Sequence, residues 1–341
     1  MTVRIGLVGL GMMGRTHLDS YRKIGQAKVV ALCDRMPERL APGWAAPTGN
    51  VESGAAGRLD LSGVRATLEF GDLVADPEVD AVDLCVPTDL HAPMARRALG
   101  AGKHVICEKP LALRTADAWR TVEAAHEAGR LLLVGHCLRF WPEYVMLKEM
   151  IESGRYGPAR RAVLTRLGCL PDWSAEGWLA DSSRSGSAAL DLHVHDADVV
   201  RWFFGPPVEI SSRGLPAPDG GILHIETRYT FADGRWAVAT GSWNFPRDFP
   251  FRMTAQVLFE SATAVFSTLD EPTLTVYEGV RPTHPPVPEA SAYTEELRHF
   301  VECIAAGRPS DRMRPEEAAA AVATVEAEIE SVRTGRPVAP A

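Results

Sequence analysis

Short apolar runs alternate with amphipathic helical segments along the first part of the chain. The apolar runs are rich in β-branched residues and predict strands at Val3–Val8, Lys28–Cys33, Asp80–Val86, His104–Cys107 and Leu131–Gly135. Helical patterns fall between them, at Met13–Ile24, His91–Ala101 and Ala116–Ala128. This alternation is typical of an α/β fold with a doubly wound parallel sheet. We therefore predict a first domain of that kind over residues 1–136.

The pattern changes after residue 136, where runs of strands follow one another. Strands are predicted at Ala159–Leu167, Val208–Ser212, Leu223–Phe231, Arg235–Trp243, Arg252–Glu260, Ala262–Thr268 and Thr273–Tyr277. Helices are predicted at Glu143–Ser153, Ala188–Phe204, Tyr293–Ala306 and Pro315–Thr334. The pattern indicates a second, α+β domain over residues 137–341, built on a large open, mainly antiparallel sheet.

The stretch 41–63 is rich in Ala, Pro and Gly and has no clear period. It predicts a surface excursion between two strands of the first domain. No function can be assigned to it.

Composition and charge narrow the classes of partner. The net charge is -8 with no basic stripe, which argues against nucleic acid and anionic membrane as partners. Glycines interrupt the apolar N-terminal run, so a signal peptide is not expected, and we expect a cytoplasmic protein. The six cysteines include no CxxC pair, which favours buried thiols over redox or metal sites.

Gly9-Leu10-Gly11-Met12-Met13-Gly14 fits the pattern GxGxxG at the junction of the first strand and its helix. In that position Gly9 permits a tight turn, Gly11 lets the main chain approach a pyrophosphate, and Gly14 lets helix and strand pack closely. The main-chain N–H groups of Gly11, Met12 and Met13 at the helix start would face the phosphates. Glycine turns also occur for structural reasons alone, so the acid that follows matters.

Asp34 lies twenty residues after Gly14, at the end of the second strand. A carboxylate there can accept hydrogen bonds from the adenosine ribose hydroxyls, although Asp34 could instead cap a turn before Pro37. Asp34 should repel a 2′-phosphate, which favours NAD. The guanidinium of Arg35 could pair with that phosphate, so NADP stays open.

Two further motifs carry groups suited to chemistry on an alcohol. Glu108-Lys109-Pro110 follows a strand and so lies at the carboxyl edge of the sheet, where doubly wound folds bind ligands. Far along the chain, Asp191 and His195 are four residues apart at the start of a predicted helix and would share one face. An imidazole can take a hydroxyl proton, and a lysine can stabilise charge on the oxygen.

Together these motifs resemble the glucose–fructose oxidoreductase / inositol dehydrogenase (Gfo/Idh/MocA) family. The resemblance runs nearly end to end and includes the glycine pattern, Asp34-Arg35, and the segments 85–91, 102–110, 134–140, 191–195 and 296–300. It implies a Rossmann domain and an NAD(P)-dependent dehydrogenase acting on CH–OH groups of a sugar, inositol or related polyol. It further implies a homodimer or homotetramer formed through the C-terminal sheet, and often a cis Lys-Pro bond.

The resemblance also assigns roles to individual residues. Lys109 would be the catalytic lysine, and Asp191 and His195 would complete the catalytic group. The nicotinamide half of the cofactor site would be lined by Pro87, Thr88, His91 and Glu108.

This chain departs from the family pattern in two places near the expected substrate pocket. Ser185-Gly186-Ser187-Ala188 stands where members usually show a run of glycines, and His193 stands where a small residue is common. Both departures concern the identity of the substrate more than the chemistry.

Each candidate also has an ordinary structural interpretation. His195 could be a buried helix-start histidine and Asp191 a helix cap. His193 and His195 have a metal-ligand spacing, but residues two apart in a helix point in nearly opposite directions, so no metal is expected.

Three residues are weaker candidates for substrate contact. His136 and Arg139 face the interdomain cleft by their position in the chain, or form an ion pair or helix cap. Trp178 could stack on a sugar face, or fill an interface.

The function predicted from the sequence is reversible hydride transfer between a secondary alcohol and a nicotinamide, with a small sugar or polyol as the only partner besides further subunits. Two alternatives stay open. One is a redox-neutral glycosidase or eliminase that retains NAD, and the other is a non-catalytic sensor that binds a dinucleotide.

Overall fold

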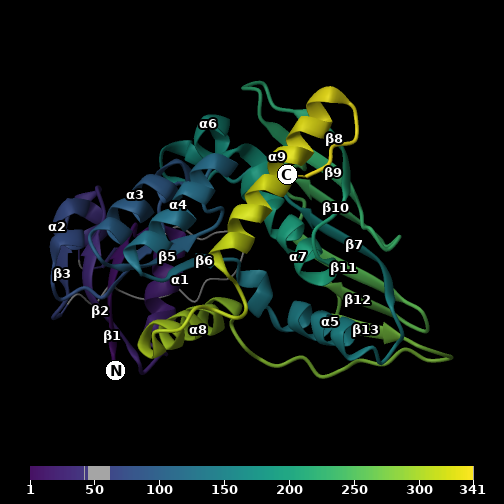
Figure 1. Ribbon diagram of the computed structural model, residues 1–341, viewed down its shortest axis with the longest axis horizontal. Coiled ribbons are helices and arrows are strands. Elements are labelled where there is room, and N and C mark those ends of the chain that lie inside the picture. Colours follow the sequence, from purple (N-terminus) through teal and green to yellow (C-terminus); the bar gives the residue numbers. More distant parts are fainter. Residues whose placement is uncertain (42, 45–61, 341) are drawn as a thin grey trace. The chain divides into compact units, whose positions relative to one another are not determined.

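The computed structural model describes residues 1–41, 43–44 and 62–340, so the predicted excursion at 41–63 lies mostly outside the described residues. The chain forms two compact units (Figure 1). The first comprises Met1–Cys137, Pro171–Trp178 and Ser291–Ala319. The second comprises Leu138–Leu170, Leu179–Ala290 and Ala320–Ala341.

The first unit contains a six-stranded sheet in which all strands run parallel, in the order β3-β2-β1-β4-β5-β6. Its strands are β1 (Val3–Val8), β2 (Ala27–Cys33), β3 (Arg65–Thr67), β4 (Ala81–Leu84), β5 (His104–Glu108) and β6 (Leu132–Gly135). The doubly wound parallel sheet predicted from the sequence is confirmed. The sequence prediction missed β3, which is three residues long and partly exposed, and the short helix α2 (Phe70–Ala75).

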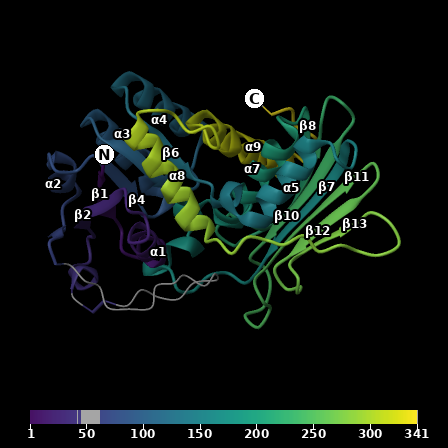
Figure 2. The same cartoon turned by 90° about the horizontal axis from the view of Figure 1, so that it is seen from below.

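Helices cover both faces of this sheet, so its central strands are apolar and buried. The helices are α1 (Met12–Tyr21), α3 (Thr88–Gly100), α4 (Thr115–Ala128) and α8 (Ala292–Ala306). Helices α3 and α4 pack together on one face, and α1 and α8 pack together on the other (Figure 2). A short 3-10 helix, Pro37–Leu40, follows β2, and another, Cys137–Phe140, follows β6.

Helix α8 corrects the expected division of the chain at residue 136. The hydroxyl of Thr294 donates to Ser20 on α1 at 3.1 Å, and the segment Ser291–Ala319 belongs to the first unit. The sequence pattern identified this helix but could not show that it returns to the first sheet, because the contact joins residues 274 positions apart.

The second unit contains a seven-stranded sheet in the order β13-β12-β11-β7-β10-β9-β8. Only β7 and β10 of these described strands pair in parallel, and the other neighbours are antiparallel. The strands are β7 (Ala159–Leu167), β8 (Glu209–Pro216), β9 (Ile222–Thr230), β10 (Trp236–Ser242), β11 (Arg252–Phe259), β12 (Thr263–Ser267) and β13 (Leu274–Tyr277). The mainly antiparallel α+β arrangement predicted from the sequence is confirmed.

One face of this sheet carries helices α5 (Pro142–Ser153), α7 (Val194–Phe204) and α9 (Pro315–Thr334), as Figure 2 shows. Residues facing them are buried, such as Ala162, Leu164, Ala237 and Ala239. In the middle of these strands the residues that alternate with them, such as Val163, Thr165, Val238 and Thr240, are only partly buried. Among the described residues, no helix reaches the combination of length and hydropathy that a membrane span requires.

Candidate active site

The glycine turn between β1 and α1 has the geometry that a dinucleotide requires. Gly9 has φ +86, and a Cβ there would lie 2.3 Å from the Cys85 carbonyl oxygen. A Cβ at Gly14 would lie 1.8 Å from the Gly9 carbonyl oxygen, so helix and turn can pack only with glycine. At Gly11 a Cβ would meet only Arg39, at 3.9 Å. The turn is closed on its inner side and open at Gly11, where the main chain would approach a pyrophosphate.

Helix α1 offers main-chain N–H groups to this opening. Gly11 is its N-cap, and no side chain caps it. Met12 and Met13 are half-buried, whereas Leu10 is fully buried against Leu7, Leu18 and Leu32. The apolar anchor fixes the turn, and the first-turn N–H groups face the opening, as anion binding at a helix start requires.

Asp34 lies at the end of β2 and is bonded to the turn itself. Its Oδ2 accepts a hydrogen bond from the Leu10 main-chain N–H at 2.7 Å, and its Oδ1 accepts one from Met36 at 2.9 Å. Arg39 also approaches Oδ2, at 3.4 Å. Asp34 is therefore both a turn cap, the structural role left open from the sequence, and a carboxylate placed beside the cofactor turn.

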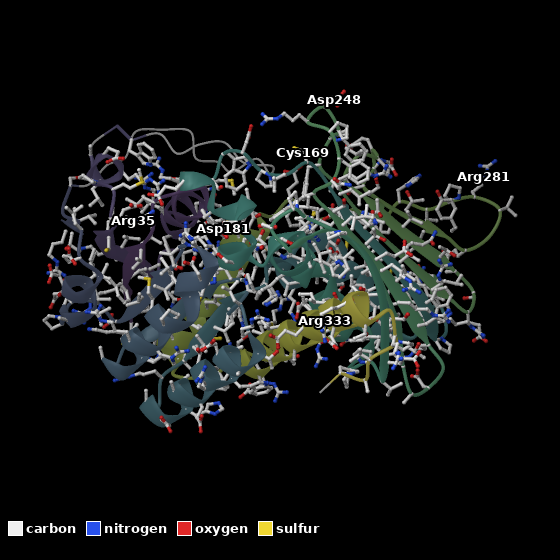
Figure 3. All side chains as sticks on the ribbon, turned by 90° about the horizontal axis from the view of Figure 1, so that it is seen from above. Arg35, Cys169, Asp181, Asp248, Arg281 and Arg333 are labelled. Atoms are coloured by element: carbon white, nitrogen blue, oxygen red, sulfur yellow. The ribbon has the colours of Figure 1, made fainter. Side chains whose placement is uncertain are left out.

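The guanidinium of Arg35 is paired with an acid other than Asp34. It forms an ion pair with Glu176, and both side chains are largely exposed. Figure 3 labels Arg35 on the unit that carries the parallel sheet. Arg39, which sequence reasoning did not single out, is the guanidinium nearer the acid, and it also lies over the ring of Trp44 at 5.6 Å.

Pro87, Thr88 and His91 follow β4 at the carboxyl edge of the sheet. Pro87 is the N-cap of α3, and the buried hydroxyl of Thr88 has no hydrogen-bond partner among the described residues. His91 is buried, with Nδ1 2.6 Å from the Pro110 carbonyl oxygen and Nε2 2.8 Å from the Val86 carbonyl oxygen. Burial lowers the pKa of His91 against the opposing effect of these carbonyls. The ring atoms of His91 thus hold two loops together.

Lys109 stands out from its surroundings at the end of β5. Within the described run Val105–Ala112 it is the one residue that is not buried. The Lys109–Pro110 peptide bond is cis, which confirms the expectation drawn from the resemblance. Its main-chain N–H donates to Oε2 of the buried Glu108 at 3.2 Å. The Lys109 side chain therefore extends from the carboxyl edge of the sheet, and its main chain is fixed by the hydrogen bond to Glu108.

Glu108 belongs to a buried polar chain that sequence reasoning missed. Nε2 of His17 lies 3.1 Å from Glu108 Oε1, and Nδ1 of His17 lies 2.8 Å from Asp83 Oδ2. The Tyr21 hydroxyl donates to the same Asp83 oxygen at 2.8 Å. The thiol of Cys85 lies 3.3 Å from Nδ1. A sequence signal existed, because Asp83 is a charged residue inside an apolar strand.

The electrostatics of this chain follow from its burial. Burial acts to lower the pKa of His17, but the charge of Asp83 and the hydrogen bond to Asp83 raise it well above its ordinary value. Burial and Asp83 raise the pKa of Cys85 so far that it stays a thiol, which leaves the carboxylates as the charges facing the ring. Burial would raise the pKa of Glu108, but His17 and Lys109 hold it below its ordinary value.

In the second unit, the predicted helix at 188–204 is divided. A π-helical turn covers Ala188–Leu192, and α7 begins at Val194. Asp191 and His195 are half-buried, whereas every other residue from Ala188 to Val200 is buried. The two residues that the motif singled out are thus those through which this helical segment reaches solvent. Short π-helical turns are frequent at functional sites.

Each of the two departures from the family pattern is accommodated by its own surroundings. Ser187 has φ +56, and its hydroxyl exchanges hydrogen bonds with both the Ile222 carbonyl oxygen, at 2.6 Å, and the Ile222 N–H, at 2.7 Å. His193 is fully buried, 3.2 Å from Glu328 and 3.2 Å from the Tyr229 hydroxyl. It packs against Gly241, where a Cβ would lie 2.8 Å from that of His193. The larger side chain is accommodated by a glycine on β10.

The weaker candidates have different environments. Arg139 is buried in a two-pronged ion pair with Asp198, at 2.9 and 2.8 Å, which is the structural alternative left open from the sequence. His136 is also buried. Trp178 is half-buried in the short 3-10 segment Ala175–Ala180.

Comparison with known proteins agrees with this geometry. Residues 3–136 match the model described as "Oxidoreductase family, NAD-binding Rossmann fold", and residues 144–265 match the GFO/IDH/MocA C-terminal domain. Inositol 2-dehydrogenase of Rhizobium meliloti is 25% identical over 99% of both chains.

Two further similar proteins are named for different substrates. The 4-carboxy-2-hydroxymuconate-6-semialdehyde dehydrogenase of a Sphingobium strain is 30% identical over 76% of this chain and 78% of its own. A solved levoglucosan dehydrogenase, in complex with NADH and levoglucosan, has a TM-score of 0.84 over both full chains at 21% identity, which shows a shared fold.

This chain belongs to the Gfo/Idh/MocA family of NAD-binding oxidoreductases. The open face at Gly11, the unpartnered buried hydroxyl of Thr88 and the acid beside the turn all fit a nicotinamide dinucleotide. The resemblance seen in the sequence is confirmed.

Proposed function

We propose that this protein is a dehydrogenase that transfers hydride between NAD(P) and a secondary alcohol of a sugar, inositol or related polyol. The main support for the proposal is the exposure of Lys109, since its neighbours in the run Val105–Ala112 are buried. Lys109 lies at the carboxyl edge of the parallel sheet, as the glycine turn does. Relatives named inositol 2-dehydrogenase and levoglucosan dehydrogenase support the substrate class.

The bound nicotinamide supplies the hydride acceptor, and the side chains supply the rest. In the proposed reaction, His195 takes the proton of the substrate hydroxyl. Lys109 donates a hydrogen bond to the same oxygen and stabilises its developing negative charge. Asp191 orients or charges this pair. The proposal requires Lys109 and His195 to converge on one oxygen.

The direct test is a panel of myo-inositol, levoglucosan, aldoses and a carboxylated semialdehyde, each with NAD and with NADP. We expect the near-ultraviolet absorbance of reduced nicotinamide to appear with at least one polyol. Tight NAD binding without reduction by any polyol would contradict the proposal and favour the redox-neutral or sensor alternatives. Turnover confined to the semialdehyde would overturn the polyol assignment while leaving a dehydrogenase.

The roles of the side chains are tested by Lys109→Ala and His195→Ala. Each should lower kcat by at least about 100-fold with the Kd for NAD little changed. Lys28→Ala, which removes an exposed lysine of β2, is the matched control and should behave as wild type. A fully active Lys109→Ala enzyme would refute the catalytic role of Lys109.

The proposal includes a homo-oligomer formed through the helix-free face of the second sheet. That face presents Trp236, Val238, Val163 and Leu258 beside Arg161, whose guanidinium lies 4.4 Å from the Trp236 ring centroid. Partly exposed apolar faces of this kind are typical of subunit contacts. Light scattering should give a mass that is a multiple of the chain mass. Trp236→Glu should reduce that mass, whereas Trp119→Glu, which changes an exposed residue of α4, should not.

We also propose a cytoplasmic location, in keeping with six free cysteines.

A further inference from the structure

The buried chain formed by Tyr21, His17, Asp83 and Glu108 lies behind the backbone of Lys109, and the proposed reaction makes no use of it. We call it the His17 chain. His17 is 1% exposed and Asp83 is 0% exposed. Buried ion pairs seldom stabilise a fold more than apolar residues of the same size would, because the charges must be desolvated. A charged chain in this position therefore calls for a role other than stability.

The geometry fixes the charge of the ring. Both nitrogens of His17 face carboxylate oxygens, Asp83 Oδ2 at 2.8 Å and Glu108 Oε1 at 3.1 Å. Ionised carboxylates only accept hydrogen bonds, so while Asp83 and Glu108 are both ionised each ring nitrogen carries a proton and His17 is an imidazolium. The raised pKa of His17 and the lowered pKa of Glu108 agree with that assignment.

The far end of the chain reaches the backbone of Lys109. With Oε1 of Glu108 held by His17, its Oε2 accepts the Lys109 N–H at 3.2 Å. Glu108 also packs against β6, since a Cβ on Gly135 would lie 3.4 Å from Oε1. On the other side of Lys109, the Pro110 carbonyl oxygen lies 2.6 Å from His91. The main chain on either side of the lysine is thus tied to a buried histidine.

We propose that Asp83 and His17 are positioning residues for Lys109. Asp83 keeps His17 doubly protonated, His17 fixes the Glu108 carboxylate, and Glu108 fixes the backbone from which the lysine side chain extends. Tyr21 completes the chain by holding the shared Asp83 oxygen. This inference rests on the proposed catalytic role of Lys109.

Other charged and titratable groups face this chain, and they define what a variant would change. Cys85 from the end of β4 lies against the His17 ring, and Glu296 from α8 acts on Tyr21. Asp83→Asn would remove one carboxylate and leave His17 with Glu108 as its single charged partner. The imidazolium would then lose its proton at a lower pH, and the Glu108 carboxylate would lose its charged donor.

The first measurement needs no turnover. In protein labelled with ¹⁵N at its ten histidines, the His17 signals are assigned by their loss in His17→Gln. An ordinary histidine has a pKa of about 6.5, but we expect both ring nitrogens of His17 to stay protonated from about pH 6 through neutrality. In Asp83→Asn we expect the ring to lose one proton at a lower pH than in the wild-type protein. A neutral His17 in the wild-type protein at pH 6 would overturn the proposal. Stoichiometric zinc bound through Nδ1, Asp83 and Cys85, whose ligand atoms lie within 4.8 Å of one another, would also overturn it.

The second measurement is kinetic and uses Asp83→Asn, with Glu108→Gln as a second variant should the first not fold. Misplacing the lysine should lower kcat by about 10- to 100-fold with little change in the Kd for NAD, and should move the pH profile of kcat. The matched control is Asp80→Asn, which breaks an ion pair with Arg4 just before the start of β4 and should leave kcat and its pH profile unchanged.

Kinetics of the Lys109, Asp83 and Glu108 variants distinguish a failure of the positioning role from a failure of the proposed dehydrogenase function. If Lys109→Ala abolishes turnover but Asp83→Asn and Glu108→Gln keep wild-type kcat and pH profile, positioning by the His17 chain is wrong and the dehydrogenase proposal stands. If Lys109→Ala is itself fully active, the proposed function fails first.

Discussion

The main-chain N–H of Leu10 donates a hydrogen bond to the carboxylate of Asp34 at 2.7 Å. The residue that would select the ribose is therefore bonded to the turn that would bind the pyrophosphate. Because Asp34 also accepts from Met36, its carboxylate is held in one orientation. We therefore expect cofactor choice and turn geometry to be linked through Asp34.

Asp34→Asn should shift cofactor preference toward NADP. The amide oxygen can still accept from Leu10, but the charge that repels a 2′-phosphate is gone, and Arg39 lies nearby. We expect the ratio of kcat/KM for NADP to that for NAD to rise by at least about tenfold, which corresponds to about 1.4 kcal/mol. Glu38→Gln, which neutralises an exposed acid four residues later, should leave the ratio unchanged. An unchanged ratio in Asp34→Asn would show that the acid does not select the cofactor.

Gly14→Ala should abolish NAD binding and destabilise the first unit. Its Cβ would lie 1.8 Å from a main-chain oxygen, so the turn itself must move. Gly25→Ala places a Cβ with nothing within 4 Å and serves as the control, expected to change stability by less than about 1 kcal/mol. Calorimetric titration with NAD and thermal unfolding of both variants check this. NAD affinity retained in Gly14→Ala would contradict the geometry of the turn.

At pH 6, Glu328→Gln should destabilise the second unit by about 3–5 kcal/mol, because it removes the carboxylate that faces the buried ring of His193. On the same helix, Glu330 pairs with Arg333 at the surface, so Glu330→Gln should cost less than about 1 kcal/mol. Denaturant unfolding measures both. Equal losses of unfolding free energy in the two variants would show that the buried pair stabilises the fold no more than the surface pair does.

The same pair predicts a pH dependence. Burial acts to lower the pKa of His193, but Glu328 raises it above its ordinary value. A histidine with a raised pKa in the folded state contributes stability that is complete below its unfolded pKa of about 6.5 and is lost as pH rises through the folded value. The difference in unfolding free energy between wild type and Glu328→Gln should be larger at pH 6 than at pH 9. A difference that grows with pH would contradict the assignment.

Ser187 combines a backbone conformation that favours glycine with two hydrogen bonds to Ile222. Ser187→Ala keeps the strained conformation and loses both bonds, whereas Ser187→Gly loses the bonds but relieves the strain. Since such strain costs about 1–3 kcal/mol, the glycine variant should be more stable than the alanine variant by about that amount. Chemical denaturation of the two proteins compares them directly, and an alanine variant as stable as the glycine variant would argue against strain at this position.

The sequence predicted the strands and long helices well because each is a local pattern. The glycine turn could be predicted because its residues are consecutive and Asp34 follows at a fixed spacing. Strand β3 has only three residues, too few to show a period. The π-helical turn at Ala188–Leu192 was absorbed into one predicted helix because its apolar pattern continues into α7.

The His17 chain could not be predicted from spacing, since its contacts join residues 66 and 91 positions apart. Asp83 was nevertheless visible as a charge within the apolar run of β4. The role of Arg139 likewise depends on a partner remote in sequence, Asp198. Residue type alone does not show that a histidine holds two loops together, as His91 does.

In the proposed reaction, Lys109 and His195 act on the same substrate oxygen. A crystal structure of the protein with NADH and myo-inositol, or with the polyol that the panel identifies, tests it most directly. We predict that Lys109 Nζ and a ring nitrogen of His195 both lie about 2.7–3.2 Å from one substrate hydroxyl oxygen, next to the nicotinamide. A complex in which the two side chains contact different parts of the ligand, or in which one of them does not reach it, would contradict the account.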